Sequence, residues 1–336
     1  MRWTRLLAGI FLLIINLTTF AANKTLTVLM LESQDSEQYQ TIRKGFLDQL
    51  DKLGYVEGRN LEITRYSVGN SEGLATRYLL LELASRKHQF DVIYTVGTIP
   101  SLAAKKYVEP TQNVVFASVT DPILGGLIDN YDAPPSGNFT GIGFMVKVQD
   151  RFKLIKRLMP RVKTLGLVYA DMPQGIAYRK RVENVLATDP NFKDLKVEFR
   201  SVPLAKGEQA TKRMIMESRK YIEELNDKVD AFISPSDALG TDEEFPQMVS
   251  RVATKPLFGI LKNDAADKRG AVAVIYPDLE SMGQHAAVMV HQLFQGKSIK
   301  DIYPRWTDTG IAIDADRAKA FNLTIPATLQ SSDSAK

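Results

Sequence analysis

The chain has 336 residues, of which 44% are hydrophobic and 24% charged, a composition that predicts one or two globular domains with an ample core. The formal net charge of +4 comes without a dense basic stripe, which argues against a nucleic-acid-binding protein. The absence of cysteine excludes a disulfide framework and a thiol for lipid attachment.

The first 22 residues have the pattern of a secretory signal peptide. Arg2 and Arg5 precede the apolar run 6–15 (LLAGIFLLII), and the small residues Ala21 and Ala22 follow it. The run is too short to span a bilayer comfortably, and the small residues offer a cleavage site. We therefore expect cleavage near residue 22 and a monomer free in a bacterial periplasm. An uncleaved N-terminal anchor is the alternative.

Three apolar segments of the first half are similar to three segments of the second half. The pairs are LTVLMLESQ (26–34) with LGLVYADMP (165–173), FDVIYTVGT (90–98) with VDAFISPSD (229–237), and NVVFASVTD (113–121) with KPLFGILKND (255–264). The spacing between partners is nearly constant along the chain. The sequence therefore predicts two similar lobes.

Short apolar strands alternate within each half with segments of helical period, such as residues 39–54 and 209–226. Parallel strands need a crossover and bury both faces of their sheet, so this alternation predicts doubly wound parallel sheets covered by helices. The Gly-rich segment 134–144 separates the halves and is the first hinge candidate. Because AVAVIYPD and a helix ending at Gly296 follow the second half, we expect several crossings between the lobes.

The predicted architecture is an α/β fold of two doubly wound parallel-sheet lobes joined by a multi-crossover hinge. We expect the first lobe to comprise residues 23–142 plus about 277–303, and the second lobe residues 143–276 plus about 304–327. Residues 328–336 (TLQSSDSAK) are polar and predicted to be a disordered tail.

Small and hydroxyl residues stand where predicted strands end and helices begin. Thr98 is followed closely by Pro100, Asp121 by Pro122, and the same pattern recurs at 234–237 (SPSD). In open parallel sheets, ligands bind at the carboxyl ends of strands, where helix N-termini present unpaired backbone N–H groups. These strand ends predict a cleft for a small polar or anionic ligand. Helix capping alone is the alternative for each residue.

Four segments resemble a known family. They are RKGFLDQLDKLGYVEGRNLEI (43–63), FASVTDPILGGL (116–127), NFTGIGF (138–144) and FNLTIPATL (321–329). They are similar to the periplasmic substrate-binding proteins of ABC transporters, of the tryptophan-importer type, and the resemblance covers nearly all of the mature chain. It implies a type I periplasmic-binding-protein fold that closes on a small molecule, such as an amino acid or other carboxylate. Such a protein delivers its ligand to an ABC permease in the inner membrane.

The resemblance places Thr98 at a helix start, Thr120 and Asp121 at the next strand end, and Asp237 at the matching end of the second lobe. We expect the threonines to hold a carboxylate or another acceptor, and Asp237 to hold an amino group or hydroxyl unless it only caps a helix. Among aromatic candidates, which also include Tyr39, Tyr178, Phe258 and Tyr276, Phe144 and Tyr169 are the preferred pair for a planar ligand. The expected ligand-binding residues are Ser33, Gln34, Thr98, Ile99, Thr120, Asp121, Phe144, Tyr169, Gln174, Ser236, Asp237 and Asn263.

One segment departs from the family. Where amino-acid-binding members have a loop of the type Asn-Pro-Gly-Glu-Ala-Asn-Ser, residues 170–176 read Ala-Asp-Met-Pro-Gln-Gly-Ile, without the Glu and the Asn. The departure argues against an aromatic amino acid as the ligand but leaves the binding role intact. A signalling role, in which the protein presents its ligand to a membrane sensor, remains an open alternative.

Enzymatic and metal-binding interpretations have weaker support. Residues 69–73 (GNSEG) match the G-x-S-x-G pattern of a nucleophile elbow, so a serine hydrolase using Ser71 with His285 or His291 is the less favoured alternative. These two histidines are six positions apart, whereas two metal ligands on one helical face need a spacing of three or four. No Walker-type sequence is present. We therefore expect no enzymatic activity, no metal and no cofactor.

Overall fold

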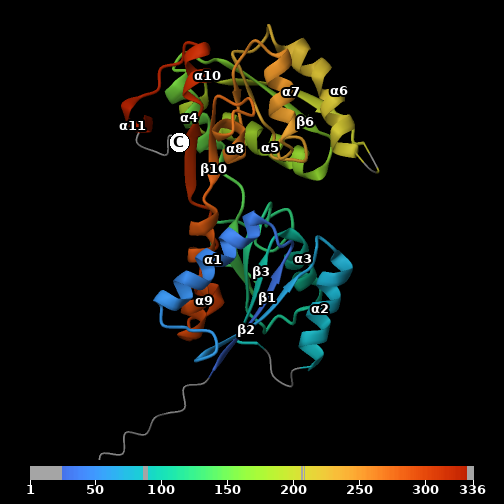
Figure 1. Ribbon diagram of the computed structural model, residues 1–336, viewed down its shortest axis with the longest axis vertical. Coiled ribbons are helices and arrows are strands. Elements are labelled where there is room, and N and C mark those ends of the chain that lie inside the picture. The colour runs from blue at the N-terminus through green and yellow to red at the C-terminus, as the bar shows by residue number, and fades with distance from the viewer. Residues whose placement is uncertain (1–24, 86–89, 206, 208, 331–336) are drawn as a thin grey trace, which may run out of the picture.

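The computed structural model describes residues 25–85, 90–205, 207 and 209–330. The predicted signal peptide and residues 331–336 of the predicted tail lie outside these ranges. Figure 1 shows two α/β lobes, one above the other, with the chain passing between them. None of the helices in the described ranges is long and apolar enough to cross a membrane.

The first lobe is built on a five-stranded parallel sheet in the order β2-β1-β3-β4-β5. Its strands are β1 (Leu26–Glu32), β2 (Leu61–Ser67), β3 (Val92–Val96), β4 (Val114–Val119) and β5 (Phe139–Gly143). The inner strands β3 and β4 are buried at every position because helices cover both faces of the sheet. Helices α1 (Glu37–Lys52) and α9 (Leu279–Phe294) cover one face, and α2 (Glu72–Ser85) and α3 (Thr98–Tyr107) cover the other.

The second lobe has a six-stranded sheet in the order β11-β10-β9-β8-β6-β7, parallel except for the pair β10 and β11. Its strands are β6 (Thr164–Ala170), β7 (Lys196–Val202), β8 (Ala231–Ile233), β9 (Leu257–Phe258), β10 (Ala273–Pro277) and β11 (Thr309–Ile313). The order β7-β6-β8-β9-β10 repeats the order β2-β1-β3-β4-β5. The predicted internal similarity and the two doubly wound lobes are thus confirmed.

Helices again cover both faces of the second sheet. The helices α4 (Val148–Leu158), α5 (Pro173–Thr188) and α10 (Ala315–Ala320) pack on one face, and α6 (Ala210–Leu225) and α7 (Glu244–Val252) on the other. The smaller elements are α8 (Lys262–Ala266), α11 (Ala327–Gln330), and the 3-10 turns η1 (Pro190–Phe192) and η2 (Ile299–Asp301). Both helical periods predicted from the sequence, at 39–54 and 209–226, correspond to helices, α1 and α6.

The predicted disordered tail is wrong for its first three residues. Residues 328–330 belong to α11, where Leu329 is buried in the core of the second lobe. Thr328 accepts a hydrogen bond from Arg157 of α4 at 2.7 Å. The polar composition of the segment concealed this single apolar anchor.

Three segments connect the lobes: residues 144–147 between β5 and α4, Asp278 between β10 and α9, and residues 302–308 between η2 and β11. In Figure 1 the second of these is visible where β10 of the upper lobe continues down into α9 of the lower lobe. The first and third lie side by side, because Gly143 N–H donates to Arg305 O at 3.1 Å. Asp278 N–H donates to the backbone carbonyl of residue 308 at 2.8 Å and joins the second segment to the third.

Two glycines allow α9 to lie directly against α1. A methyl group on Gly283 would overlap the carbonyl oxygen of Ile42, and one on Gly45 would overlap the carbonyl oxygen of Glu280. The two helix backbones are therefore in contact. Since α9 follows the second lobe in sequence, this contact is what returns the chain to the first lobe.

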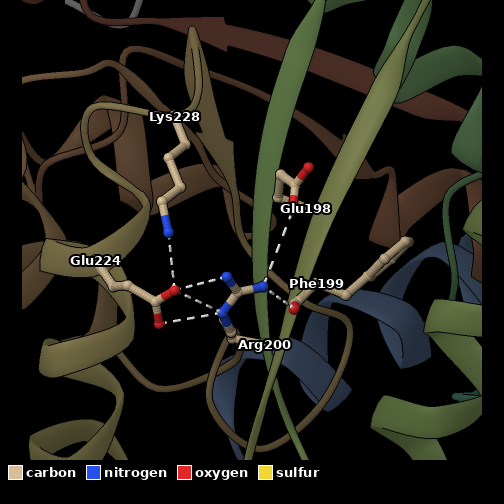
Figure 2. Close-up of polar contacts among 5 residues, drawn as sticks. All are labelled: Glu198, Phe199, Arg200, Glu224 and Lys228. Carbon is tan, nitrogen blue, oxygen red and sulfur yellow. Dashed lines mark hydrogen bonds and ion pairs between the residues drawn. The ribbon is translucent and has the colours of Figure 1, made fainter.

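An ion-pair cluster joins the edge strand β7 to α6. Figure 2 shows Arg200 between Glu224 of α6 and Glu198 of its own strand. Arg200 Nη2 lies 2.6 Å from Glu224 Oε1, and Lys228 donates to the same oxygen at 3.0 Å. The hydrogen bonds from Arg200 lower the pKa of Glu224 to about 2. Because these side chains are partly exposed, the cluster places charge along the edge of the sheet and adds little to stability.

We expect Gly283→Ala to lower the free energy of unfolding by about 1 to 3 kcal/mol, because the added methyl group overpacks the contact between α1 and α9. Gly73→Ala is the matched control. Gly73 is exposed in α2, its Cβ would lie 3.7 Å from Ser71 Oγ, and the better helix former should leave stability equal or slightly higher. Denaturant unfolding followed by circular dichroism measures both variants. Wild-type stability of Gly283→Ala would contradict the direct contact.

Candidate functional site

The carboxyl ends of the parallel strands in both sheets face the space between the lobes. Strand β5 ends at Gly143, where the first crossing segment begins, and β10 ends at Pro277, immediately before the second. In a parallel sheet all strands end at the same edge, so the ends of the other parallel strands lie along this space too. This is the location that the sequence predicts for a ligand.

The first lobe brings four of the expected residues together at this edge. Thr98 Oγ1 accepts a hydrogen bond from Thr120 N–H at 3.3 Å, and Asp121 follows directly. Ser33, at the end of β1, lies against Gly97, because a methyl group on that glycine would overlap Ser33 Oγ. The polar residues that follow β1, β3 and β4 therefore lie close together.

The predicted helix start at Asp121-Pro122 is wrong. Residues 122–126 form turns in which Leu124 N–H donates to Asp121 Oδ1 at 3.0 Å. Gly126, with φ +63°, takes a left-handed conformation that ends them. Helix α3 does begin at Thr98, as predicted. Of these two strand ends, only that of β3 therefore offers a helix N-terminus to an anionic group.

Asp237 is held by the backbone around it. Its Oδ2 accepts from Ala170 N–H at 2.8 Å, and its Oδ1 from Leu239 N–H at 2.8 Å and Gly240 N–H at 3.4 Å. Only 4% of the residue is exposed, and this burial raises the pKa of Asp237 to about 6. Both oxygens already have donors, so the carboxylate stabilises the turns that follow it rather than a ligand's amino group. The helix start expected at 234–237 is not formed, because α7 begins only at Glu244.

Phe144 and Tyr169, the preferred aromatic pair, have different surroundings. Tyr169 is 4% exposed, and its hydroxyl accepts a hydrogen bond from Arg179 of α5 at 2.9 Å. Phe144 instead lines a narrow crevice with Tyr178 and Ser236. Tyr178, another of the aromatic candidates, projects from α5 and lines the same crevice as Phe144.

The other expected residues have less defined surroundings. Gln174, at the start of α5, and Asn263, in α8, are exposed, and Gln34 is half-buried. Within the described part of the chain, the side chains of these three form no hydrogen bond. Ile99 packs against the core between the sheet and α2–α3, so its side chain contributes to the core of the first lobe.

Arg151 of α4 was not predicted and is a buried cation in the wall of the crevice. It is 4% exposed and donates to the carbonyl oxygens of Ser234 at 2.9 Å and Gly259 at 3.0 Å, and to the hydroxyl of Tyr178. No carboxylate of the described residues lies within ion-pairing distance of it. The sequence carries a signal for it, because Arg151 stands on the apolar face of its helix, three positions after Val148.

Arg181 of α5 was also missed, and it contacts the opposite lobe. Its guanidinium forms an ion pair with Asp121, and Nη1 lies 3.2 Å from Met145 Sδ in the first crossing segment. Tyr131 lies beside the pair, and its pKa is raised by burial and by the charge of Asp121. A predicted site residue of the first lobe therefore has a charged partner in the second.

The features that suggested a hydrolase have other roles. Ser71 Oγ accepts a hydrogen bond from Leu74 N–H at 3.2 Å and caps α2. His285 lies at the third crossing segment, with its Nε2 2.6 Å from Asp308. In the part of the chain that the structure describes, no hydrogen bond joins Ser71 to His285 or His291, which the less favoured hydrolase alternative would use. Among the described residues, no group of three acidic or histidine side chains is placed to hold a metal ion.

Comparison with known proteins identifies the family. The sequence matches the family described as ABC transporter substrate binding protein over residues 26–334. A relative named tyrosine-binding protein, from Clostridioides difficile (strain R20291), is 26% identical over 283 residues, covering 84% of this chain and 76% of the relative.

Solved structures share the architecture. The ligand-free, open structure of a substrate-binding protein with adhesive properties from Clostridium difficile has a TM-score of 0.72 at 20% identity and covers 90% of this chain and 96% of its own. A complex with L-Trp from Streptococcus pneumonia has a TM-score of 0.65 at 21% identity and covers 93% and 99%. The predicted type I periplasmic-binding-protein fold is confirmed.

We expect the carboxyl group of Asp237 to titrate near pH 6, because burial disfavours its charged form more than three N–H donors favour it. Relative to an unfolded value of about 3.9, the shift corresponds to about 3 kcal/mol. Since the folded pKa is the higher one, the stability that this group contributes is complete below about pH 4 and is lost as the pH rises through about 6. Carbon-detected NMR titration measures the pKa directly.

Unfolding of Asp237→Asn provides the thermodynamic check. Its free energy of unfolding minus that of the wild type should rise by up to about 3 kcal/mol between pH 4 and pH 7, as the wild-type carboxylate becomes charged. Asp242→Asn makes the same chemical change at a half-buried residue that accepts one hydrogen bond, from Glu244 N–H at 2.9 Å. A measured pKa below 4 for Asp237 would show that the hydrogen bonds outweigh burial.

Proposed function

This chain belongs to the family of ABC transporter substrate-binding proteins, and from that premise we propose that it binds an amino acid between its lobes and delivers it to an ABC permease. The observation that carries the proposal is the pair of parallel-sheet edges that meet across three crossing segments. One edge offers the hydroxyl groups of Thr98 and Thr120 beside the N-terminus of α3. Such groups suit the carboxylate of an amino acid.

An amino acid with an aromatic ring is the first candidate ligand. The relative from Clostridioides difficile is named for tyrosine, and the Streptococcus pneumonia structure holds L-Trp. The departure at residues 170–176 removes a Glu and an Asn, and Asp237 is engaged by backbone. The two relatives outweigh the expectation drawn from residues 170–176, so we keep the aromatic ligand class and look elsewhere for the acceptor of its amino group.

In this proposal, closure of the two lobes around the ligand is the conformational change that precedes transport. The crossing segments are hydrogen-bonded to each other, so the lobes rotate as units about residues 141–147 and their neighbours. A ligand that contacts both edges stabilises the closed form, which the permease then recognises. Ligand capture of this kind needs no chemical step, and we propose that the protein is not an enzyme.

The cellular location follows from the role. ABC substrate-binding proteins act outside the cytoplasmic membrane, as extracellular or periplasmic proteins. We propose that the signal peptide is cleaved near residue 22 and that the mature monomer works in the periplasm, where it meets the permease of the inner membrane.

L-Tyrosine or L-tryptophan should bind, stabilise the protein and close it. At a concentration one hundred times its dissociation constant, a ligand that binds only the folded state adds about 2.7 kcal/mol to the free energy of unfolding. Thermal shift with all common L-amino acids finds the ligand, and small-angle scattering at saturation should show a smaller radius of gyration. If no amino acid of the panel stabilises the protein, the proposal is wrong.

Thr98→Val tests whether the ligand lies at the strand ends. Loss of a hydrogen bond to a charged group costs about 1.5 to 3 kcal/mol, so affinity should fall by about tenfold to a hundredfold. Thr188→Val is the matched control, because Thr188 is exposed near the end of α5 and bonds only its own helix at Asn184 O. Equal affinity of the two variants would place the ligand away from Thr98.

A further inference from the structure

We propose that the ligand's side chain enters a cavity beside the hinge and that its charged groups replace the ion pair between Arg181 and Asp121. The inference rests on the proposed function and names the residues that select the ligand. It assigns the carboxylate of an α-amino acid to Arg181, in addition to the hydroxyl groups of Thr98 and Thr120 proposed above, and the ammonium group to Asp121.

The cavity lies between α5 and the first crossing segment and has a volume of about 340 Å³. Its apolar walls are Ile123, Met145, Val146, Tyr178, Val185 and Trp306. Small-molecule pockets usually measure roughly 300 to 1,000 Å³, so this volume suits a single amino acid. Both lobes and two of the crossing segments contribute to the walls. A ligand in this place therefore contacts both lobes and two of the three crossing segments.

The cavity walls suit a flat ring. Trp306 is half-buried and stacks on Tyr131, with ring centroids 4.1 Å apart and an interplanar angle of 29°. Tyr178 also lines the cavity, and its hydroxyl accepts a hydrogen bond from Arg151. Met145 adds a polarisable thioether that adapts to an aromatic surface. Aromatic and sulfur groups held in this way favour an aromatic side chain over a small polar one.

The ion pair beside the cavity matches an amino acid in charge. Arg181 and Asp121 carry opposite charges side by side, as do the carboxylate and ammonium groups of a zwitterion. When the ligand enters between them, each protein charge exchanges one partner for another, and no charge is left unpaired. Lys147 and Lys180 also line the cavity and favour the ligand's carboxylate.

Asp121 is the available acceptor for the amino group. One of its oxygens accepts from Leu124 N–H, and the other pairs with Arg181 of the opposite lobe. Asp237 is engaged by three N–H groups, and Glu32 is fully buried in the first lobe. The ammonium contact is thus assigned to the first lobe, opposite residues 170–176.

The test compares amino acids with their decarboxylated analogues by calorimetry. The probes are L-tyrosine and L-tryptophan with tyramine and tryptamine. The wild type should bind the better amino acid at least tenfold more tightly than its amine. In Arg181→Gln, affinity for the amino acid should fall at least tenfold while affinity for the amine changes little, so that the preference disappears. If Arg181 had only a structural role, the substitution would lower the affinity for the amino acid and for the amine equally.

Two further variants complete the design. Val185→Trp fills the cavity. It should lower the affinity for the amino acid and for the amine alike by at least tenfold, and melting curves show whether the variant folds. Arg200→Gln is the matched control, because Arg200 lies in the surface cluster of Figure 2 on the edge strand, and it should bind as the wild type does.

The outcomes separate this inference from the proposed function. A wild type that binds no amino acid overturns both. If the wild type binds one but Arg181→Gln keeps the preference for the carboxylate, the proposed function stands and the assignment to Arg181 is wrong. If Val185→Trp folds and binds with wild-type affinity, the ring does not occupy this cavity.

Discussion

The direct contact between α1 and α9 determines how the rest of this chain is arranged. Helix α9 follows the strands of the second lobe, yet its buried side chains complete the core of the first, where Gly283 and Gly45 let the two backbones touch. The chain must therefore leave the first lobe, return to it and leave again. The three crossings lie side by side and are hydrogen-bonded to one another, which permits rotation of the lobes and resists their separation.

Charged groups are concentrated where the lobes face each other, and each is compensated in a different way. Arg151 is buried against carbonyl oxygens and a phenol, Asp237 against backbone N–H groups, and Arg181 against a carboxylate of the other lobe. The first two contacts lie within the second lobe and make its edge rigid. The third connects parts that move relative to one another. Only a contact of this third kind can respond to a ligand, because closure changes its geometry.

Much of the fold could be predicted from the sequence, because apolar strand runs, helical period and internal similarity are local patterns that each half repeats. The site was predicted less completely, since its contacts join distant residues. Arg181 and Asp121 are 60 positions apart, and no local pattern pairs them. The helix expected after Asp121 is replaced by turns, which end at the adjacent residues Gly125 and Gly126. Arg151 was different, because a charge on an apolar helix face is a signal that the sequence does contain.

The charged edge of the second lobe has a consequence for the protein in a concentrated solution. Strand β7 ends the six-stranded sheet, and an edge strand presents backbone groups with which another chain can form hydrogen bonds. Glu198 and Arg200 on β7, together with Glu224 and Lys228 nearby, place alternating charges along this edge. A second strand that added there would have to bury these charges. The edge is therefore protected against intermolecular sheet formation.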